Sequence, residues 1–188
     1  MMGSQMKLYL WNIAILISFL PFNLISPVYA QRTSTKSLSE NPAANERQIK
    51  REAFSFLYDS TWVLDKSDTE YNPDSFLSFD SRTKNGFITI IIYDHPTDSK
   101  KNVNEQLAEH RATTMKTSTY SRFSQWGKYK GSGVILKGRI MDTYPGEIKV
   151  FSYSNSKVSF LVVSQIFDDD KKLDQPGLKV IENSFQLK

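Results

Sequence analysis

Hydrophobic residues recur at two spacings along this chain, and the change of spacing predicts the order of its elements. Residues 54–58 place aromatic side chains at alternate positions, which is typical of a strand with one apolar face. Residues 87–93 are almost continuously apolar, and residues 157–167 are apolar in both alternating sets, so these two strands are expected to be covered on both faces. Further strands are predicted at residues 76–80, 120–126, 134–141 and 147–154.

Turn-forming residues separate these strands. An Asn-Gly pair at residues 85–86 predicts a tight hairpin because both residues tolerate positive φ, and Asn-Ser at residues 155–156 predicts a second two-residue turn. A glycine-rich stretch at residues 127–133 and a Pro-Gly pair within residues 142–146 predict two more turns. Because tight hairpins join antiparallel neighbours, most strand pairings are expected to be antiparallel.

Two segments have helical spacing. The first is expected over residues 103–116, with Asn102 as its N-cap and Glu105 as the capping-box partner. The second is a short final helix capped by Asp174. The apolar face of this final helix comprises Leu178, Ile181 and Phe185. The order strands, helix, strands, helix predicts an α+β fold, an antiparallel sheet of about six strands with helices packed on it in α/β/α layers.

The N-terminal thirty residues have the pattern of an export signal. Lys7 is their only charge, an apolar run follows over residues 8–25, and Val28 and Ala30 place small side chains at the −3 and −1 positions of a cleavage site. We therefore expect residues 1–30 to be a signal peptide and the protein to be exported, periplasmic or secreted. The alternative is a protein anchored in a membrane by this segment, uncleaved.

A polar segment separates this signal from the rest of the chain. Residues 31–52 are rich in Ser, Thr, Asn and Gln and contain almost no apolar side chain, so burial cannot offset the entropy of ordering them. They predict a flexible polar linker. Residues 53–188 are then expected to form one α+β domain, because their length suits a single core.

Composition narrows the classes of function. The chain has 24 Lys+Arg, 20 Asp+Glu and no cysteine, which excludes disulfides, thiolate metal sites and a cysteine nucleophile. The mild positive charge is interpreted as ordinary solubility, and an exported protein rarely meets nucleic acid, so no nucleic-acid partner is predicted. Membrane contact is expected only through residues 1–30, if they are not cleaved.

The two histidines carry no catalytic pattern. Neither His95 nor His110 has a second histidine four residues on, and no Gly-x-Ser-x-Gly motif supplies a nucleophile. We therefore expect a protein that is not an enzyme and has no cofactor, no catalytic residue and no metal site.

An acidic loop is the one candidate for a cation. Asp168, Asp169, Asp170 and Asp174 supply carboxylates of the kind that Ca²⁺ binds. Their spacing does not match a calcium-binding loop, however, and two neighbouring lysines compete for the carboxylates. A solvated turn is therefore favoured over a calcium site.

Aromatic and cationic residues interleave over residues 120–130, in the combination that binding hot spots use. The predicted partner-binding surface comprises Arg122, Trp126, Lys128 and Tyr129, facing an acidic partner or an anionic envelope surface. The alternative is that a strand face pointing into the core accounts for half of these residues without any ligand.

Two local phrases, together with the order of elements, resemble the PsbP-like family, which is named for an extrinsic subunit of photosystem II and includes many exported bacterial proteins. They are residues 54–62 (Phe-Ser-Phe-Leu-Tyr-Asp-Ser-Thr-Trp) and residues 177–185 (Gly-Leu-Lys-Val-Ile-Glu-Asn-Ser-Phe). The first phrase departs from the family pattern, because Asp59-Ser60-Thr61 stands where a proline usually comes before Trp62. The resemblance covers roughly residues 53–188 and implies a PsbP-like fold with a non-catalytic binding or assembly role.

Taken together, these features predict an exported, non-enzymatic binding or assembly module of the cell envelope or the secreted fraction, which recognises a protein partner. The alternative is a small-ligand or divalent-cation binding protein in the same compartment, with a pocket between the sheet and a helix.

Overall fold

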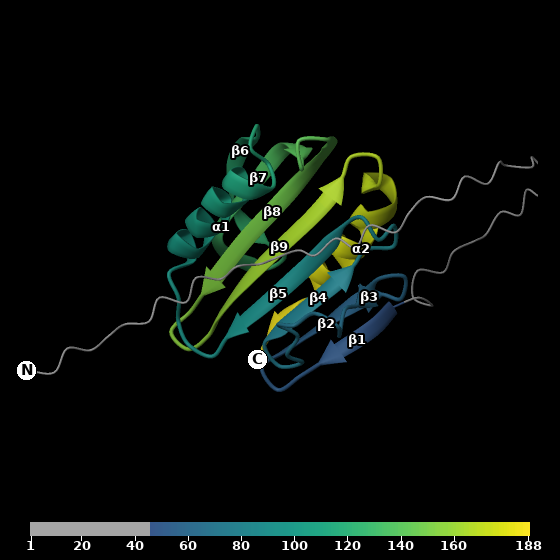
Figure 1. Cartoon of the computed structure of the whole chain (residues 1–188). Coiled ribbons are helices and arrows are strands. Elements are labelled where there is room, and N and C mark those ends of the chain that lie inside the picture. The colour runs from purple at the N-terminus through teal and green to yellow at the C-terminus, as the bar shows by residue number, and fades with distance from the viewer. Residues whose placement is uncertain (1–45) are drawn as a thin grey trace, which may run out of the picture. The chain divides into compact units, whose positions relative to one another are not determined.

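The computed structural model describes residues 46–188, which form two antiparallel sheets and two helices (Figure 1). The large sheet has seven strands in the order β3 (Val63–Leu64), β4 (Phe76–Asp80), β5 (Phe87–Tyr93), β9 (Ser159–Phe167), β8 (Tyr144–Ser154), β7 (Tyr129–Ile140) and β6 (Thr119–Trp126). The small sheet has three strands in the order β1 (Glu46–Lys50), β2 (Phe54–Asp59) and β10 (Gln186–Leu187). The helices are α1 (Ser99–Thr113) and α2 (Lys171–Ser184).

The expected α+β class with antiparallel pairing is confirmed, but the large sheet has seven strands instead of about six. The additional strand, β3, pairs only two residues with β4, which is too short to produce a periodic pattern in the sequence. Among the described residues, 46–188, neither helix is long and apolar enough to cross a membrane.

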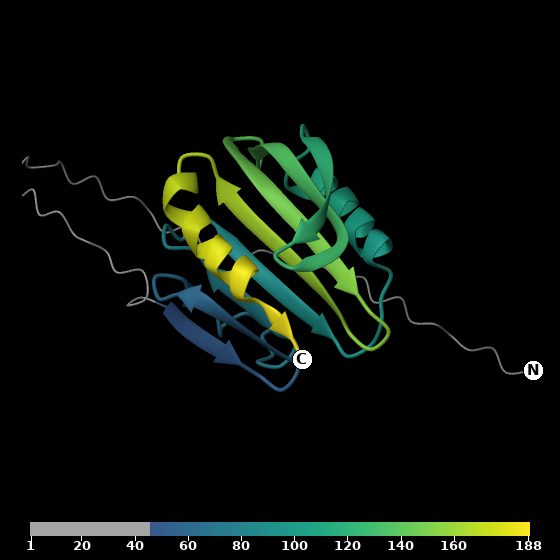
Figure 2. The same cartoon turned by 180° about the vertical axis from the view of Figure 1, so that it is seen from behind.

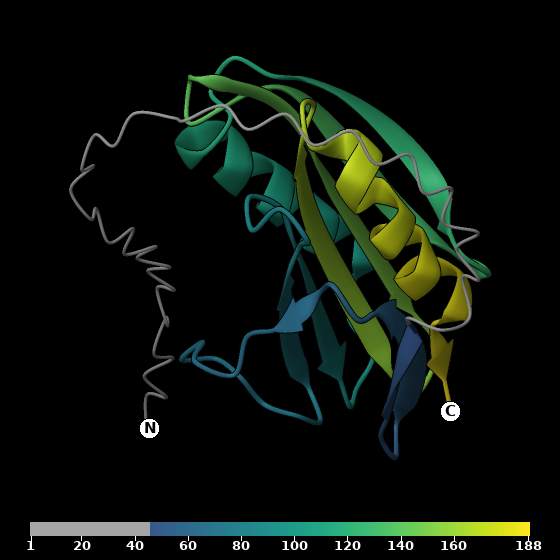
Figure 3. The ribbon, with the colours of Figure 1, turned by 90° about the vertical axis from the view of Figure 1, so that its right-hand side faces the viewer.

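The large sheet separates the two helices. Helix α1 lies against β7, β8 and β9 on one face, and α2 lies against β9 on the other face, where it also packs on β2 of the small sheet. Figure 2 shows α2 and the small sheet side by side on the rear face, and Figure 3 shows α1 and α2 on opposite sides of the large sheet. The expected layers are therefore present, with the second helical layer completed by three short strands.

Strands β5 and β9 are covered on both faces, as their apolar sequences predict. On the α2 side, Ile90 and its cross-strand partner Val162 belong to a core rich in aromatic residues. On the α1 side, Leu161 and Val163 belong to a second, mainly aliphatic core beneath α1. Each strand of this central pair therefore contributes to two cores.

Phe185, at the end of α2, is the centre of the aromatic core. It is 1% exposed and lies where α2 gives way to β10. Its ring contacts five other rings, at centroid distances of 4.9 Å to Phe160, 5.4 Å to Trp126, 5.8 Å to Tyr129, 6.0 Å to Phe56 and 6.3 Å to Phe54. These rings come from both sheets, so Phe185 joins the small sheet to the large one.

The two sequence phrases at residues 54–62 and 177–185 pack against each other. Trp62 is 2% exposed and lies so close to Gly177 that a Cβ atom there would overlap the indole ring. The backbone N–H of Leu57 donates to Ser184 Oγ at 2.8 Å. Strand β2 and helix α2 therefore form one unit, although the two hydrogen-bonded residues are 127 positions apart in the sequence.

The end of the expected linker belongs to the folded domain. Residues 46–50 form β1 and pair with β2 from Glu46 opposite Asp59 to Lys50 opposite Ser55. Only one side chain of β1 is buried, so this strand is held mainly by its backbone ladder, which leaves little hydrophobic pattern to detect. The rest of the linker and the signal peptide, residues 1–45, lie outside the described residues.

Helix α1 begins four residues earlier than predicted. Its N-cap is Asp98, whose carboxylate accepts the backbone N–H groups of Lys100 and Lys101 at 2.9 and 3.1 Å. Asn102, the predicted cap, lies inside the helix and donates to Thr97 Oγ1 at 2.9 Å. The first turn is polar, so apolar spacing did not reveal it.

Several predicted turns are shorter than expected because their glycines lie inside strands. Residues 127–128 alone form the β6–β7 turn, where Gly127 has a φ of +53°. Gly133 lies within β7, and a Cβ atom there would overlap the ring of Phe123. Likewise the predicted turn at 142–146 is confined to residues 141–143, and its Pro-Gly pair belongs to β8.

The other two hairpins are present with altered geometry. In the hairpin before β5, the positive φ of 64° falls on Lys84 and not on the Asn-Gly pair. The β8–β9 connection spans residues 155–158 instead of two residues, and the Asn155 carboxamide oxygen accepts the backbone N–H groups of Lys157 and Val158. Side-chain hydrogen bonding therefore stabilises a longer turn than the pattern predicts.

We predict that Phe185→Ala lowers the free energy of unfolding by about 3–5 kcal/mol, because it leaves a cavity among five aromatic rings. Urea denaturation followed by tryptophan fluorescence measures this loss. Tyr144→Ala is the matched control, since Tyr144 is 60% exposed, and it should change stability by less than about 0.5 kcal/mol. Equal losses in the two variants would contradict the central role of Phe185.

His110 makes the stability of the fold sensitive to acid. It lies on α1, both of its ring nitrogens are buried without a hydrogen-bond partner among the described residues, and burial lowers its pKa from 6.5. As the pH falls through about 6.5, the unfolded chain binds a proton at His110 that the folded chain does not yet accept. Stability is therefore retained above that pH and is lost below it, until the folded state also protonates.

We predict that His110→Leu reduces the stability lost between pH 8 and pH 5, measured by urea denaturation at both pH values. His95→Leu, at an exposed histidine, should keep the wild-type loss. If both variants retain the wild-type pH dependence, His110 does not contribute to it.

Candidate functional site

The edge of the large sheet formed by β6 and β7 has an unusual charge. From residue 110 to residue 141 the sequence contains no Asp or Glu. The seven cations of this stretch, which we call the basic edge, are Arg111, Lys116, Arg122, Lys128, Lys130, Lys137 and Arg139. The stretch alone carries +7 against a formal net charge of +4 for the whole chain, so the remainder of the chain is net negative.

The fold leaves these cations available to an external group. All seven side chains are exposed. Within the part of the chain that the structure describes, only Lys116 has a carboxylate within ion-pair distance, Asp142 Oδ2 at 3.9 Å. Six of the seven cations therefore lack a carboxylate partner inside residues 46–188, which favours binding of an anionic group.

Two arginines of the basic edge converge on Tyr120 of β6. The Cζ atoms of Arg111, on α1, and Arg122, on β6, lie 5.8 and 5.9 Å from the centre of the Tyr120 ring. Arg122 Nη2 also donates to Asn104 Oδ1 of α1 at 2.9 Å. The cation–π contacts and this hydrogen bond orient both guanidinium groups, which keep further donors for a carboxylate. We call these three residues, Arg111, Tyr120 and Arg122, the Arg–Tyr–Arg cluster.

The structure divides the four residues of the predicted partner-binding surface. Arg122 and Lys128 are exposed, as that prediction requires. Trp126 and Tyr129 are 3% and 9% exposed and lie in the aromatic core, so the expectation that they form a surface is wrong. They face each other across the β6–β7 hairpin and both contact Phe185, because this end of the hairpin closes over the core.

Other members of the basic edge escaped the sequence analysis. Arg111 lies on a predicted helix, and Lys137 and Arg139 lie on a separate predicted strand. Helix packing brings Arg111 to Tyr120, and strand pairing places Lys137 opposite Thr119 of β6. The signal that was available is the absence of acidic residues from 110 to 141, which runs across three elements. Charge counted over that length would have indicated one electropositive region.

A partly buried ion pair positions the tip of the β6–β7 hairpin. Glu182 of α2 accepts the N–H of Gly127 at 3.2 Å and lies 3.7 Å from Lys149 Nζ and 2.8 Å from Lys179 Nζ. Burial lowers the pKa of Lys149. Burial also acts to raise the pKa of Glu182, but the hydrogen bond from Lys179 and the charge of Lys149 outweigh it, so the net pKa of Glu182 is lowered. Glu182 therefore remains an anion that fixes the hairpin to α2.

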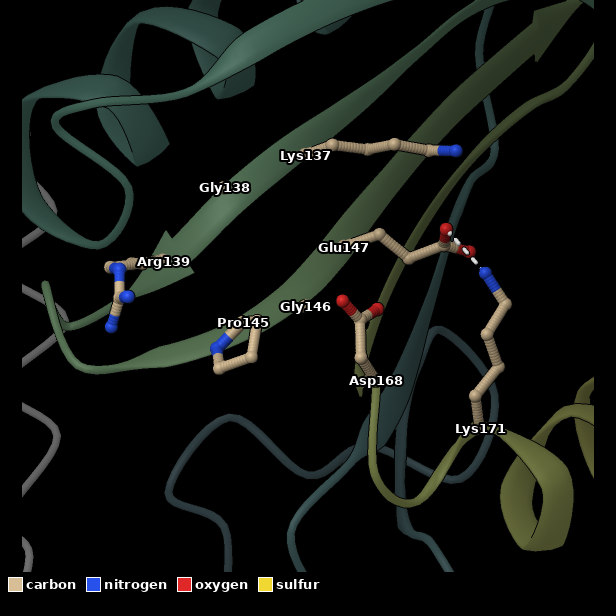
Figure 4. Close-up of a pocket in the computed structure, with 8 residues that line it drawn as sticks. All are labelled: Lys137, Gly138, Arg139, Pro145, Gly146, Glu147, Asp168 and Lys171. Carbon is tan, nitrogen blue, oxygen red and sulfur yellow. Dashed lines mark hydrogen bonds and ion pairs between the residues drawn. The ribbon is translucent and has the colours of Figure 1, made fainter.

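An open cavity of about 450 Å³ lies between β7, β8 and the start of α2 (Figure 4). Lys171 Nζ and Glu147 Oε2 pair across it at 2.9 Å, and Lys137 extends toward the same region, whereas Arg139 points away. Asp168 adds a second carboxylate. The cavity is large enough for a small molecule. Its lining consists mainly of charged side chains and glycine backbone, however, whereas most ligand pockets are mainly apolar.

The acidic loop does not form a common cation site. Asp174 is fully buried inside α2 and accepts Thr83 Oγ1–H at 2.6 Å and the Thr83 N–H at 3.3 Å, so it is neither the predicted cap nor part of a loop. Asp170 accepts from Asn85 at 2.8 Å. Over residues 46–188, no group of three or more His, Asp or Glu side chains is arranged to hold a metal ion.

Neither histidine belongs to a group of side chains that could hold a metal ion within residues 46–188. His95 Nδ1 lies 2.9 Å from the Asp94 carboxylate in an exposed loop, and its hydrogen bond lowers the pKa of Asp94. His110 lies on α1, and its two buried ring nitrogens have no polar partner among the described residues. Neither arrangement places a nucleophile beside a histidine.

Comparison with known proteins adds a likeness of fold. No protein-family model matches the chain, and no curated protein matches it. The chain is similar to the solution structure of cyanobacterial PsbP (CyanoP) from Synechocystis sp. PCC 6803, at 10% identity and a TM-score of 0.47, over 83% of this chain and 98% of that chain. It is also similar to a crystal structure from Bacteroides thetaiotaomicron, at 10% identity and a TM-score of 0.40, over 77% of this chain and 49% of that chain. Likeness at this level concerns the arrangement of strands and helices, and function has to be inferred from this chain's own residues.

We predict that Asp174→Ala lowers the free energy of unfolding by about 1–3 kcal/mol, because it leaves the Thr83 donors without their buried acceptor. Asp169→Ala is the matched control, since Asp169 is exposed. Urea denaturation in the presence of EDTA compares the two variants with the wild-type protein. The same comparison is repeated with Ca²⁺ in place of EDTA. If Asp174→Ala is less stable than the wild-type protein only in Ca²⁺, Asp174 binds a cation instead.

Proposed function

We propose that this protein is an exported, non-enzymatic binding or assembly module that recognises an acidic protein partner through its basic edge. The observation that carries the proposal is the set of exposed cations on β6, β7 and the end of α1, six of them without a carboxylate partner in residues 46–188. Charge complementarity of this kind speeds association and selects the partner. The export pattern of residues 1–30 supports a partner in the cell envelope or the secreted fraction.

The resemblance to the PsbP-like family supports the same class of role. The two phrases that carry it, residues 54–62 and 177–185, are in direct contact through Trp62 and Gly177. The family includes many exported bacterial proteins, the resemblance implies a non-catalytic binding or assembly role, and we propose that this chain is a distant member.

The surface chemistry favours a protein over a nucleic acid. Proteins that bind single-stranded nucleic acid usually stack bases on exposed aromatic rings. Here Trp126 and Tyr129 are buried, and the Tyr120 ring is already approached by two guanidinium groups. The oriented arginines are instead suited to the carboxylates of Asp and Glu side chains.

A small-ligand binding protein is the second candidate function. It is supported by the cavity of about 450 Å³ beside β7 and β8, where Lys137 and Asp168 offer opposite charges. A ligand in this cavity would raise the melting temperature of the protein through mass action. Substitutions in the Arg–Tyr–Arg cluster would leave that effect unchanged, which distinguishes the two functions.

We predict that the double variant Arg111→Gln, Arg122→Gln binds poly-L-glutamate about tenfold more weakly than the wild-type protein at an ionic strength of about 0.15 M. The reason is the loss of two oriented cations from the basic edge. Fluorescence anisotropy with labelled polyglutamate measures the affinity, and the melting temperature should stay unchanged because both side chains are exposed.

The matched control is Arg47→Gln with Arg82→Gln, which removes the same charge from two exposed arginines outside the basic edge. It should retain wild-type affinity. The proposal fails if the two double variants bind equally, or if a duplex DNA is bound more tightly than polyglutamate at the same ionic strength.

A further inference from the structure

Strand β6 leaves one side of its backbone unpaired within the described residues. It is the last strand of the seven-stranded sheet and pairs only with β7. No backbone hydrogen bond from residues 119–126 to any other part of residues 46–188 is present. In an antiparallel pair, alternate residues turn their N–H and C=O groups toward the neighbour, so the remaining residues of β6 turn theirs outward. A row of donors and acceptors is therefore free to pair with an added strand.

The other sheet edges offer less backbone for such pairing. Strands β3 and β10 contain two residues each, and β1 contains five with charges of both signs. By contrast, β6 contains eight residues, and most of its side chains are exposed. Among the described strands, β6 therefore presents the longest edge, and its one charged side chain, Arg122, is a cation.

A bulge limits the usable part of this edge. The pairing of β6 with β7 is regular from Thr119 to Phe123 and shifts register between Phe123 and Gln125. Gly131 and Ser132 of β7 lie opposite the single residue Ser124 of β6, so the extra residue belongs to β7, and the bulge increases the twist of the pair beyond Phe123. An added strand therefore has residues 119–123 as its template.

We infer that the acidic partner binds as an added β-strand, which pairs with the outer edge of β6 at residues 119–123 and places acidic side chains beside the Arg–Tyr–Arg cluster. This inference rests on the proposed function and specifies how the partner is held. Backbone pairing supplies affinity, and the side chains on alternate positions supply specificity.

The side chains of β6 define which residues suit the added strand. Tyr120 and Arg122 point to the α1 side, where they meet Arg111, so acidic residues at alternate positions of the partner would lie next to two guanidinium groups. Thr119 and Ser121 point to the opposite side, where small polar or β-branched side chains fit. The expected motif is a short run in which Asp or Glu alternates with Thr or Val.

Charge argues against a second copy of this chain as the occupant. Pairing β6 with β6 of another copy would bring two sets of arginines together across the new ladder. Like charges on directly opposed strand positions are destabilising. An acidic strand reverses the sign of that interaction, so it is the occupant that this edge favours.

The test uses the full chain and a capped, labelled peptide, Thr-Glu-Val-Glu-Val-Glu-Thr, in three forms. One form is unmodified, the second is N-methylated on every Glu, and the third is N-methylated on both Val residues. Successive residues of a strand direct their N–H groups to opposite edges, so only one methylated form can block the edge that faces β6. The expected result is that one methylated form binds at least about tenfold more weakly than the other, whatever the register.

Amide hydrogen exchange of residues 119–123 gives a second readout. Adding the unmodified peptide should slow exchange of the outward-facing amides of β6, and adding the weaker methylated form should not. Arg47→Gln with Arg82→Gln should behave like the wild-type protein in both measurements, whereas Arg111→Gln with Arg122→Gln should weaken all three peptides.

The outcomes separate this inference from the proposed function. If both methylated forms bind as tightly as the unmodified peptide, the edge attracts acidic chains without strand pairing, and only the strand-addition inference is overturned. If a Lys-for-Glu version of the peptide binds as well as the original, the acidic-partner function is overturned too. Self-association of the chain with protection of residues 119–123 in the absence of peptide would show that a second copy occupies the edge.

Discussion

The contact of Phe185 with five aromatic rings is the interaction on which this structure most depends. Phe185 follows the last turn of α2, and its ring reaches β2 of the small sheet and β6, β7 and β9 of the large sheet. Without disulfides in a chain that has no cysteine, aromatic burial has to connect the two sheets. The adjacent packing of Trp62 on Gly177 extends the same contact along α2. The first and last described segments are thereby held in one domain.

This core also explains the chemistry of the exposed edge. Trp126 and Tyr129 anchor one end of the β6–β7 hairpin inside the molecule, and the ion pair of Glu182 with Lys149 fixes its turn to α2. Beyond this end, Val134 and Leu136 of β7 are buried in the core beneath α1, whereas most side chains of β6 are exposed. Every charged side chain of the hairpin is a cation. A hairpin base held in the core and an edge whose charged side chains are all cations support the binding role that we propose.

Much of the fold could be predicted from the sequence because most strands have a recognisable spacing of apolar residues and are bounded by turn-forming residues. Strands β4 and β5 have the predicted bounds, and the apolar runs of β5 and β9 correctly indicate cover on both faces. Errors arose where local signals competed. Gly133 lies in a strand because it accommodates the Phe123 ring, and Asp174 is a buried acceptor for Thr83 instead of a cap. The roles of both residues are set by neighbours distant in sequence.

The sequence by itself determined the order and type of the elements, and the absence of acidic residues between 110 and 141, because spacing and charge are properties of the linear chain. Only the tertiary structure decided which aromatic residues of the β6–β7 hairpin are buried and which cations share one edge. The physical reason is that burial depends on what α2 and the small sheet cover. The sequence near each residue does not show which side chains α2 and the small sheet bury. It also does not show that Arg111 and Arg122 both contact Tyr120.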